Sequence, residues 1–165
     1  MRSFFKHPDL DKFYKVFEKE EKSPIFSGKF DLFYYCFLIG VSAGKRSGWD
    51  SNESSDALEL AKRFPNNMKD SKLLILNLLL TGYTIEKKKK VEVDTFANSI
   101  LARLIDHEDI NQLSEEGYKR INSFAYAGFD ILYNDENYKY PTNGSEAIIK
   151  IKEILDTNFS KKPWV

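Results

Sequence analysis

The stretch from Phe30 to Val41 constrains the fold more than any other part of the chain. Its aromatic and aliphatic side chains recur at helical spacing and also cover most of the remaining circumference: Phe30, Leu32, Phe33, Tyr34, Tyr35, Cys36, Phe37, Leu38, Ile39 and Val41. A helix that is apolar nearly all round is a buried helix, so this stretch predicts a central helix over about residues 28–43. Gly44 follows it, and glycine readily adopts the left-handed conformation that ends a helix.

Helical spacing of apolar residues predicts further helices on both sides of this one. They cover about residues 10–22, 56–63, 72–81, 91–105 and 115–133, and a last helix follows the capping-box pair Asn143 and Glu146. We expect Gly82 and the run 85–90 to break the helix at 72–81, and no segment predicts a strand. The sequence therefore predicts an all-α fold, a single-domain helical bundle over residues 1–165 around the helix at 28–43, with a frayed tail at 160–165.

Composition narrows the classes of protein to which the chain can belong. Aromatic residues are unusually frequent, with 13 Phe, 9 Tyr and 2 Trp among 165 residues, and most must lie in the interior or at an interface. The single cysteine, Cys36, excludes a disulfide framework, and its apolar neighbours indicate a core residue. The chain starts without the apolar run of a signal peptide and holds no membrane-spanning stretch, so we expect a soluble cytoplasmic protein.

Several short motifs resemble catalytic or metal-binding sequences, and each lacks an essential feature. GVSAGKRS at residues 40–47 has three residues rather than four between its glycines and has Arg46 where a P-loop needs Ser or Thr. The run 106–109 (DHED) lacks the spacing of a metal site and predicts a solvated acidic turn. Glu86 and Lys88 match a nuclease Glu-x-Lys pair only because four lysines follow one another. We therefore expect no catalytic residue, no metal site and no cofactor.

Basic residues raise the hypothesis of a DNA-binding surface. The chain carries 25 basic and 25 acidic residues, which argues against a protein that coats nucleic acid but allows a local basic patch. The basic clusters are Lys45-Arg46, Lys62-Arg63, Lys87 to Lys90 and Lys119-Arg120. The candidate phosphate-binding residues are Lys45, Arg46, Lys87, Lys88, Lys89, Lys90 and Arg120. Basic pairs at helix ends also complement the helix dipole without any ligand.

Aromatic residues outside the predicted helices favour a different hypothesis. Trp49, Tyr138, Tyr140 and Trp164 lie in predicted loops or in the tail, where burial in the core explains them less well. Tyr and Trp are frequent anchors of protein interfaces. The sequence therefore also predicts binding to another protein.

Two stretches resemble small accessory proteins that are encoded beside bacterial DNA phosphorothioation (Dnd-type) defence genes. The first is IFSGKFDLFYYCFLIGVSAGKR at residues 25–46, and the second is FAYAGFDIL at residues 124–132. In the second stretch, Ala127 stands where that family has a glycine, and Asp130 stands where it has a glutamate.

The resemblance implies a non-catalytic accessory subunit of a prokaryotic anti-phage or DNA-modification system. Its partners would be other protein subunits of that system, with direct DNA binding as the alternative. The resemblance carries over no catalytic residue and directs attention to Lys29, Asp31, Lys45 and Arg46. Because Lys29 and Asp31 are two residues apart on a helix, they cannot face each other, so each is expected to contact another helix or a partner. Lys29, Asp31, Trp49, Tyr138 and Tyr140 are the candidate partner-binding residues.

Overall fold

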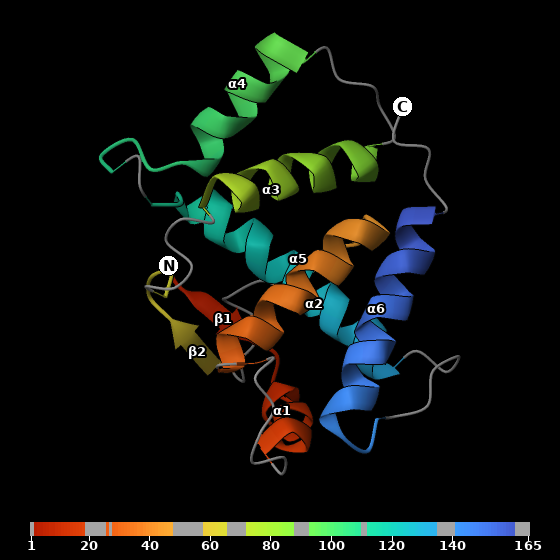
Figure 1. The fold of residues 1–165 in the computed structure, drawn as a ribbon. Coiled ribbons are helices and arrows are strands. Elements are labelled where there is room, and N and C mark those ends of the chain that lie inside the picture. The colour runs from red at the N-terminus through yellow and green to blue at the C-terminus, as the bar shows by residue number, and fades with distance from the viewer. Residues whose placement is uncertain are drawn as a thin grey trace.

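A computed structural model of the chain describes residues 2–18, 26, 28–47, 58–65, 72–87, 93–109, 112–134 and 141–160. Within these residues the protein is mostly helical and has two short strands (Figure 1). The elements are β1 (Phe4–Lys6), α1 (Leu10–Glu18), α2 (Lys29–Ala43), β2 (Leu58–Ala61), α3 (Lys72–Lys87), α4 (Val93–Leu104), α5 (Glu115–Asn134) and α6 (Gly144–Ser160).

The helix predicted at 28–43 is confirmed as α2, which packs against α1, α3, α5 and α6. Its broadest contact is with α5, and the two helices lie across each other in the middle of the molecule (Figure 1). Gly44 ends α2 in the left-handed conformation, with φ 64°, as predicted. The helix is thus enclosed by neighbouring helices because nearly every side of it is apolar.

Two glycines set how closely α2 and α5 approach. A Cβ atom at Gly40 would lie 2.0 Å from the Phe124 carbonyl oxygen, and one at Gly128 would lie 1.8 Å from the Cys36 carbonyl oxygen. Such separations are far below van der Waals contact, so only glycine fits at either position. Residues 29–43 and 124–132 therefore form the central helix contact of this fold.

The prediction that Gly82 breaks the third helix is wrong. Gly82 lies inside α3, and a Cβ atom there would come within 2.7 Å of the Phe124 ring. Glycine weakens a helix only by about 1 kcal/mol, and here it makes room for a buried aromatic ring. The helices at 91–105 and 115–133 are confirmed as α4 and α5, and the predicted capping box opens α6, since the Glu146 amide donates to Asn143 Oδ1 at 2.9 Å.

The prediction that the chain has no strands is also wrong. β1 and β2 form a two-stranded antiparallel sheet. Phe4 pairs with Ala61, and Lys6 pairs with Leu58, with an irregularity between Phe4 and Phe5. The segment predicted as a helix at 56–63 contains β2. Its Leu, Glu and Ala residues favour a helix locally, but pairing with β1 overrides that preference.

The second edge of β1 is satisfied by side chains of α5 rather than by a third strand. The Phe5 amide donates to Asn122 Oδ1 at 3.0 Å, and Asn122 Nδ2 donates to the Ser3 carbonyl at 3.0 Å. One helical turn further along α5, the Tyr126 hydroxyl donates to the Lys6 carbonyl at 2.9 Å. The carboxamide of Asn122 thus takes the place of a peptide group in a neighbouring strand.

Many of the Phe and Tyr side chains pack against one another in the interior. Phe4 is fully buried, and its ring centroid lies 4.8 Å from that of Phe64 and 4.9 Å from that of Tyr118. The rings of Phe30 and Phe33 lie 5.0 and 5.7 Å away on α2. Edge-to-face contacts of this kind add to the free energy of burial, and they attach the small sheet to α2 and α5.

Candidate functional site

Three of the four basic clusters adjoin the N-terminal half of α5. Lys45 and Arg46 are exposed directly after α2, and the next residue, Ser47, donates its amide to the Ser123 carbonyl at 3.0 Å. Lys119 is exposed on α5 itself. Arg120 is largely buried there, with its Nε atom 3.3 Å from Glu116 Oε1. This side of α5 is therefore where the predicted phosphate-binding residues come together.

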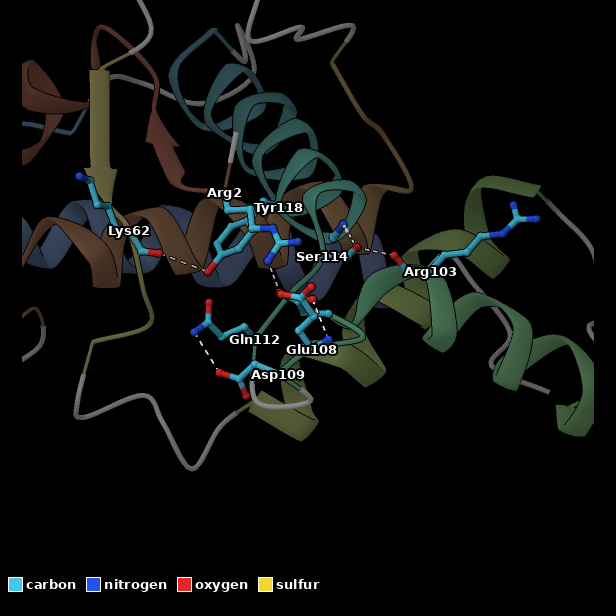
Figure 2. A network of polar contacts seen from close by, with 10 residues as sticks. Arg2, Lys62, Arg103, Glu108, Asp109, Gln112, Ser114 and Tyr118 are labelled. Carbon is cyan, nitrogen blue, oxygen red and sulfur yellow. Dashed lines mark hydrogen bonds and ion pairs between the residues drawn. The ribbon is translucent and has the colours of Figure 1, made fainter.

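Lys62 and Arg63 reach the same helix from β2. The Tyr118 hydroxyl donates to the Lys62 carbonyl at 3.3 Å, while the side chains of Lys62 and Arg63 are exposed. Burial raises the pKa of Tyr118, and the positive charges of Arg63 and Arg2 act on it in the opposite direction. Figure 2 shows Arg2, Lys62 and Tyr118 together at the start of α5.

The fourth cluster does not belong to this group in the described structure. Lys87 is the last residue of α3, and its side chain lies outside the described residues, as do Lys88, Lys89 and Lys90. Glu86 lies in α3 and not on a strand, which removes the strand on which the nuclease interpretation depended.

The acidic turn after α4 is built differently from the prediction. Asp106 is only 6% exposed, forms an ion pair with Arg2, and accepts the Glu108 amide at 3.1 Å through its second oxygen. His107 and Glu108 are exposed, as expected for a turn. The prediction of a fully solvated turn is therefore wrong at Asp106, where burial is stabilised by the Arg2 guanidinium and a backbone amide.

A residue at the end of this turn also caps the first turn of α5. Ser114 accepts the Gly117 amide at 3.1 Å and donates to the Arg103 carbonyl, so a single hydroxyl joins the end of α4 to the start of α5 (Figure 2). Gln112 Nε2 donates to Asp109 Oδ2 at 3.0 Å within the same turn. Among the residues that the structure describes, no group of three or more His, Cys, Asp or Glu side chains could hold a metal ion.

Of the candidate partner-binding residues, the structure describes Lys29 and Asp31, both in the first turn of α2. Lys29 Nζ lies 3.0 Å from Asp11 Oδ1 and 5.9 Å from the centroid of the Tyr14 ring, so it contacts α1. Lys6 forms an ion pair with the same Asp11 carboxylate. Asp31 is half-buried in the first turn of α2. Trp49, Tyr138 and Tyr140 lie outside the described residues, as does Trp164.

A cluster around His7 is the feature that the sequence did not reveal. The His7 ring stacks on Phe129 at 4.4 Å, and His7 Nε2 lies 3.5 Å from Asp130 Oδ1. His7 Nδ1 accepts the Asp9 amide at 3.2 Å. Burial lowers the pKa of His7, while Asp130 and Asp9 act to raise it. Only the fold brings residue 7 next to residue 130, so no spacing in the chain could have indicated this pair.

Cys36 lies in the core as predicted, between α2 and α5. It is almost completely inaccessible, and burial strongly raises the pKa of its thiol, which keeps it protonated and unreactive. The GVSAGKRS segment at 40–47 ends a helix rather than opening one, so its backbone amides are not arranged as in a phosphate-binding P-loop.

Comparison with family models, with curated proteins and with solved structures gives no match to this chain. In the part of the chain that the structure describes, every helix is too short or too polar to cross a lipid bilayer.

Proposed function

We propose that this protein is a cytoplasmic, non-catalytic accessory subunit of a prokaryotic anti-phage or DNA-modification system, and that it acts by binding another protein subunit of that system. In this proposal, the helices form a bundle around α2 that serves as a scaffold for binding surfaces. The two stretches that resemble Dnd-associated accessory proteins support it, because they form the α2–α5 contact on which such a scaffold depends.

The observation that carries the proposal is the outer side of α6. Ala147, Ile151 and Ile154 face the core, whereas Ile149 is 55% exposed and Phe159 is 37% exposed. At about 100° per residue, Ile149 and Phe159 project about 80° apart on the solvent side of the helix. They lie about 15 Å apart along the helix axis, so they would act as two separate apolar anchors for a partner rather than as one continuous patch.

Charged side chains lie between these apolar residues. Lys152 and Asp156 form an ion pair one turn apart on the same side of α6. α6 packs against α2 and α5 and lies at the edge of the molecule (Figure 1). A mixed apolar and charged surface of this kind can bind a partner protein and still keep this protein soluble when α6 is uncovered.

Binding to the proteins encoded beside this chain tests the proposal. Each neighbouring protein is purified and titrated against the wild type and against the variant Ile149→Glu/Phe159→Glu. We expect one neighbour to bind, and the variant to bind it at least tenfold more weakly.

Leu74→Glu is the control, because Leu74 is 53% exposed in the first turn of α3, and α3 begins on the side of the molecule away from α6 (Figure 1). It should bind like the wild type. Equal binding by the wild type and the α6 variant, or binding by none of the neighbouring proteins, would overturn the proposal.

A further inference from the structure

The N-terminal half of α5 carries a second surface, which we call the α5 basic surface: Arg2, Lys45, Arg46, Lys62, Arg63 and Lys119. All six side chains are exposed. They come from four separate parts of the chain, and hydrogen bonds to α5 bring two of these parts to it. These are the Ser47 amide to the Ser123 carbonyl and the Tyr118 hydroxyl to the Lys62 carbonyl.

The two hydrogen bonds place the basic pairs close together along the helix. Tyr118 and Ser123 are five residues apart, which corresponds to about 7.5 Å along the helix axis and about 140° around it. Lys119 projects at about 100° from Tyr118, between the two. Lys119 therefore lies on α5 between the two residues, Tyr118 and Ser123, to which the segments carrying the two basic pairs are bonded.

Acidic side chains near the surface are partly neutralised by partners within the protein. Glu116 lies 3.3 Å from Arg120, and Asp106 forms an ion pair with Arg2. Two further acids are Glu115, which is exposed in the first turn of α5, and Glu59, which accepts the uncharged Ser3 hydroxyl at 2.9 Å. The basic side chains of the surface outnumber these acids although the chain as a whole carries 25 basic and 25 acidic residues. Positive charge is thus concentrated here by the fold.

We propose that the α5 basic surface binds the phosphate backbone of DNA. Lys and Arg side chains that neutralise phosphates release condensed counterions, and this release provides sequence-independent affinity. Several cations on one surface suit the regular charge of a duplex. The end of α6 lies beside the end of α2, since Asn158 Nδ2 donates to Ser42 Oγ at 3.1 Å, but the two proposals use different side chains, so either can fail while the other stands.

Fluorescence anisotropy with a labelled mixed-sequence duplex tests the inference at several salt concentrations. The observed binding constant should fall with salt, with a log–log slope of about −0.9 for each phosphate contacted. The double variants Lys45→Ala/Arg46→Ala and Lys62→Ala/Arg63→Ala should each make the slope shallower by about 1.8, and Lys119→Ala by about 0.9.

The control variant is Lys12→Ala/Lys15→Ala, which removes the same charge from exposed positions on α1. It should keep the wild-type slope. The inference is overturned if the control changes the slope as much as the other two double variants do, or if the wild type fails to bind the duplex at 50 mM salt. Binding to a polyglutamate peptide without binding to the duplex would also overturn it and would assign the surface to an acidic protein. Circular dichroism of each variant shows whether it folds.

Discussion

Gly128 lies against the backbone of Cys36 so closely that a Cβ atom at Gly128 would stand 1.8 Å from the Cys36 carbonyl oxygen. A Cβ atom at Gly40 would meet the Phe124 carbonyl at 2.0 Å. In both cases the obstacle is backbone, which cannot move aside as a flexible side chain can. The contact between α2 and α5 therefore requires glycine, which has no Cβ atom, at both positions.

Replacing either glycine with alanine should separate the two helices. We expect Gly128→Ala and Gly40→Ala each to lower the free energy of unfolding by about 3 kcal/mol or more, at the upper end of what overpacking costs, because the clash is with backbone. Urea denaturation monitored by circular dichroism measures this change.

Gly28→Ala serves as the control, because nothing lies within 4 Å of a Cβ atom there and its backbone is extended, with φ 179°. It should cost at most about 1 kcal/mol, which is the price of alanine at a helix N-cap. A Gly128→Ala protein as stable as Gly28→Ala would contradict the close contact between α2 and α5.

Local pattern was enough to predict the helices but not the small sheet. The apolar residues of α2 and α5 recur at helical spacing over many turns, so their positions follow from the sequence alone. The strands β1 and β2 span three and four residues. Their pairing is held by Asn122 and by ring contacts of Phe4, which are far away in the chain, and no local pattern encodes such contacts.

Asn122 is the side chain whose loss should damage the sheet most. Only 1% of it is exposed, and Asn122→Ala would leave the Phe5 amide and the Ser3 carbonyl without their hydrogen-bond partner. Leaving a buried polar group unsatisfied costs about 1–3 kcal/mol. We therefore expect the free energy of unfolding to fall by at least about 2 kcal/mol, and the Phe5 amide to exchange faster with deuterium.

Tyr126→Phe is the comparison for this variant, since it removes only the hydrogen bond to the Lys6 carbonyl. Its expected cost is about 1 kcal/mol. If Asn122→Ala cost no more than Tyr126→Phe, the carboxamide would not be acting as a substitute for a strand.

The sequence predicted only part of the candidate site, because some of its residues are neighbours in the chain and others are brought together only by the fold. Lys45, Arg46 and Arg120 were identified because basic pairs are visible in the sequence. The roles of Arg2 and Asp106 were missed, because their ion pair joins residues 104 positions apart. Long-range pairs of this kind depend on tertiary packing, and a single sequence gives no direct sign of them.

The start of α6 offers a smaller and more local test. Asn143 Oδ1 accepts the Glu146 amide at 2.9 Å, and Glu146 Oε2 in turn accepts the Thr142 amide at 2.8 Å. Asn143→Ala should therefore lower the free energy of unfolding by about 1 kcal/mol, whereas Asn143→Ser should stay close to the wild type. Thermal and urea denaturation would show the difference. Equal losses for the two variants would indicate that side-chain capping at this position contributes nothing.

The His7 cluster should make stability fall as the pH drops below about 6.5. Burial lowers the pKa of His7 in the folded protein below its ordinary value of 6.5. The unfolded chain therefore binds a proton more readily, and the contribution of His7 is fully present above pH 6.5 and is lost as pH falls toward the folded pKa. Protonation would also turn Nδ1 into a donor, so it could no longer accept the Asp9 amide.

Asp130 acts in a different range of pH. Burial raises the pKa of its carboxyl group above the ordinary 3.8, and His7 opposes that rise. The carboxyl group of the unfolded chain titrates near pH 4, well below the range of His7. A loss of stability just below pH 6.5 can therefore be compared between variants at His7 with Asp130 left in place.

Urea denaturation at pH 7.5, 6.5 and 5.5 measures this dependence. The wild type should lose stability as pH falls, and His7→Gln should lose less, since glutamine does not titrate. His107→Gln is the matched control, because His107 is exposed after α4, and it should keep the wild-type slope. An NMR titration should give His7 a pKa below the ordinary value of 6.5. A wild-type slope that persists in His7→Gln would show that another group causes the pH dependence.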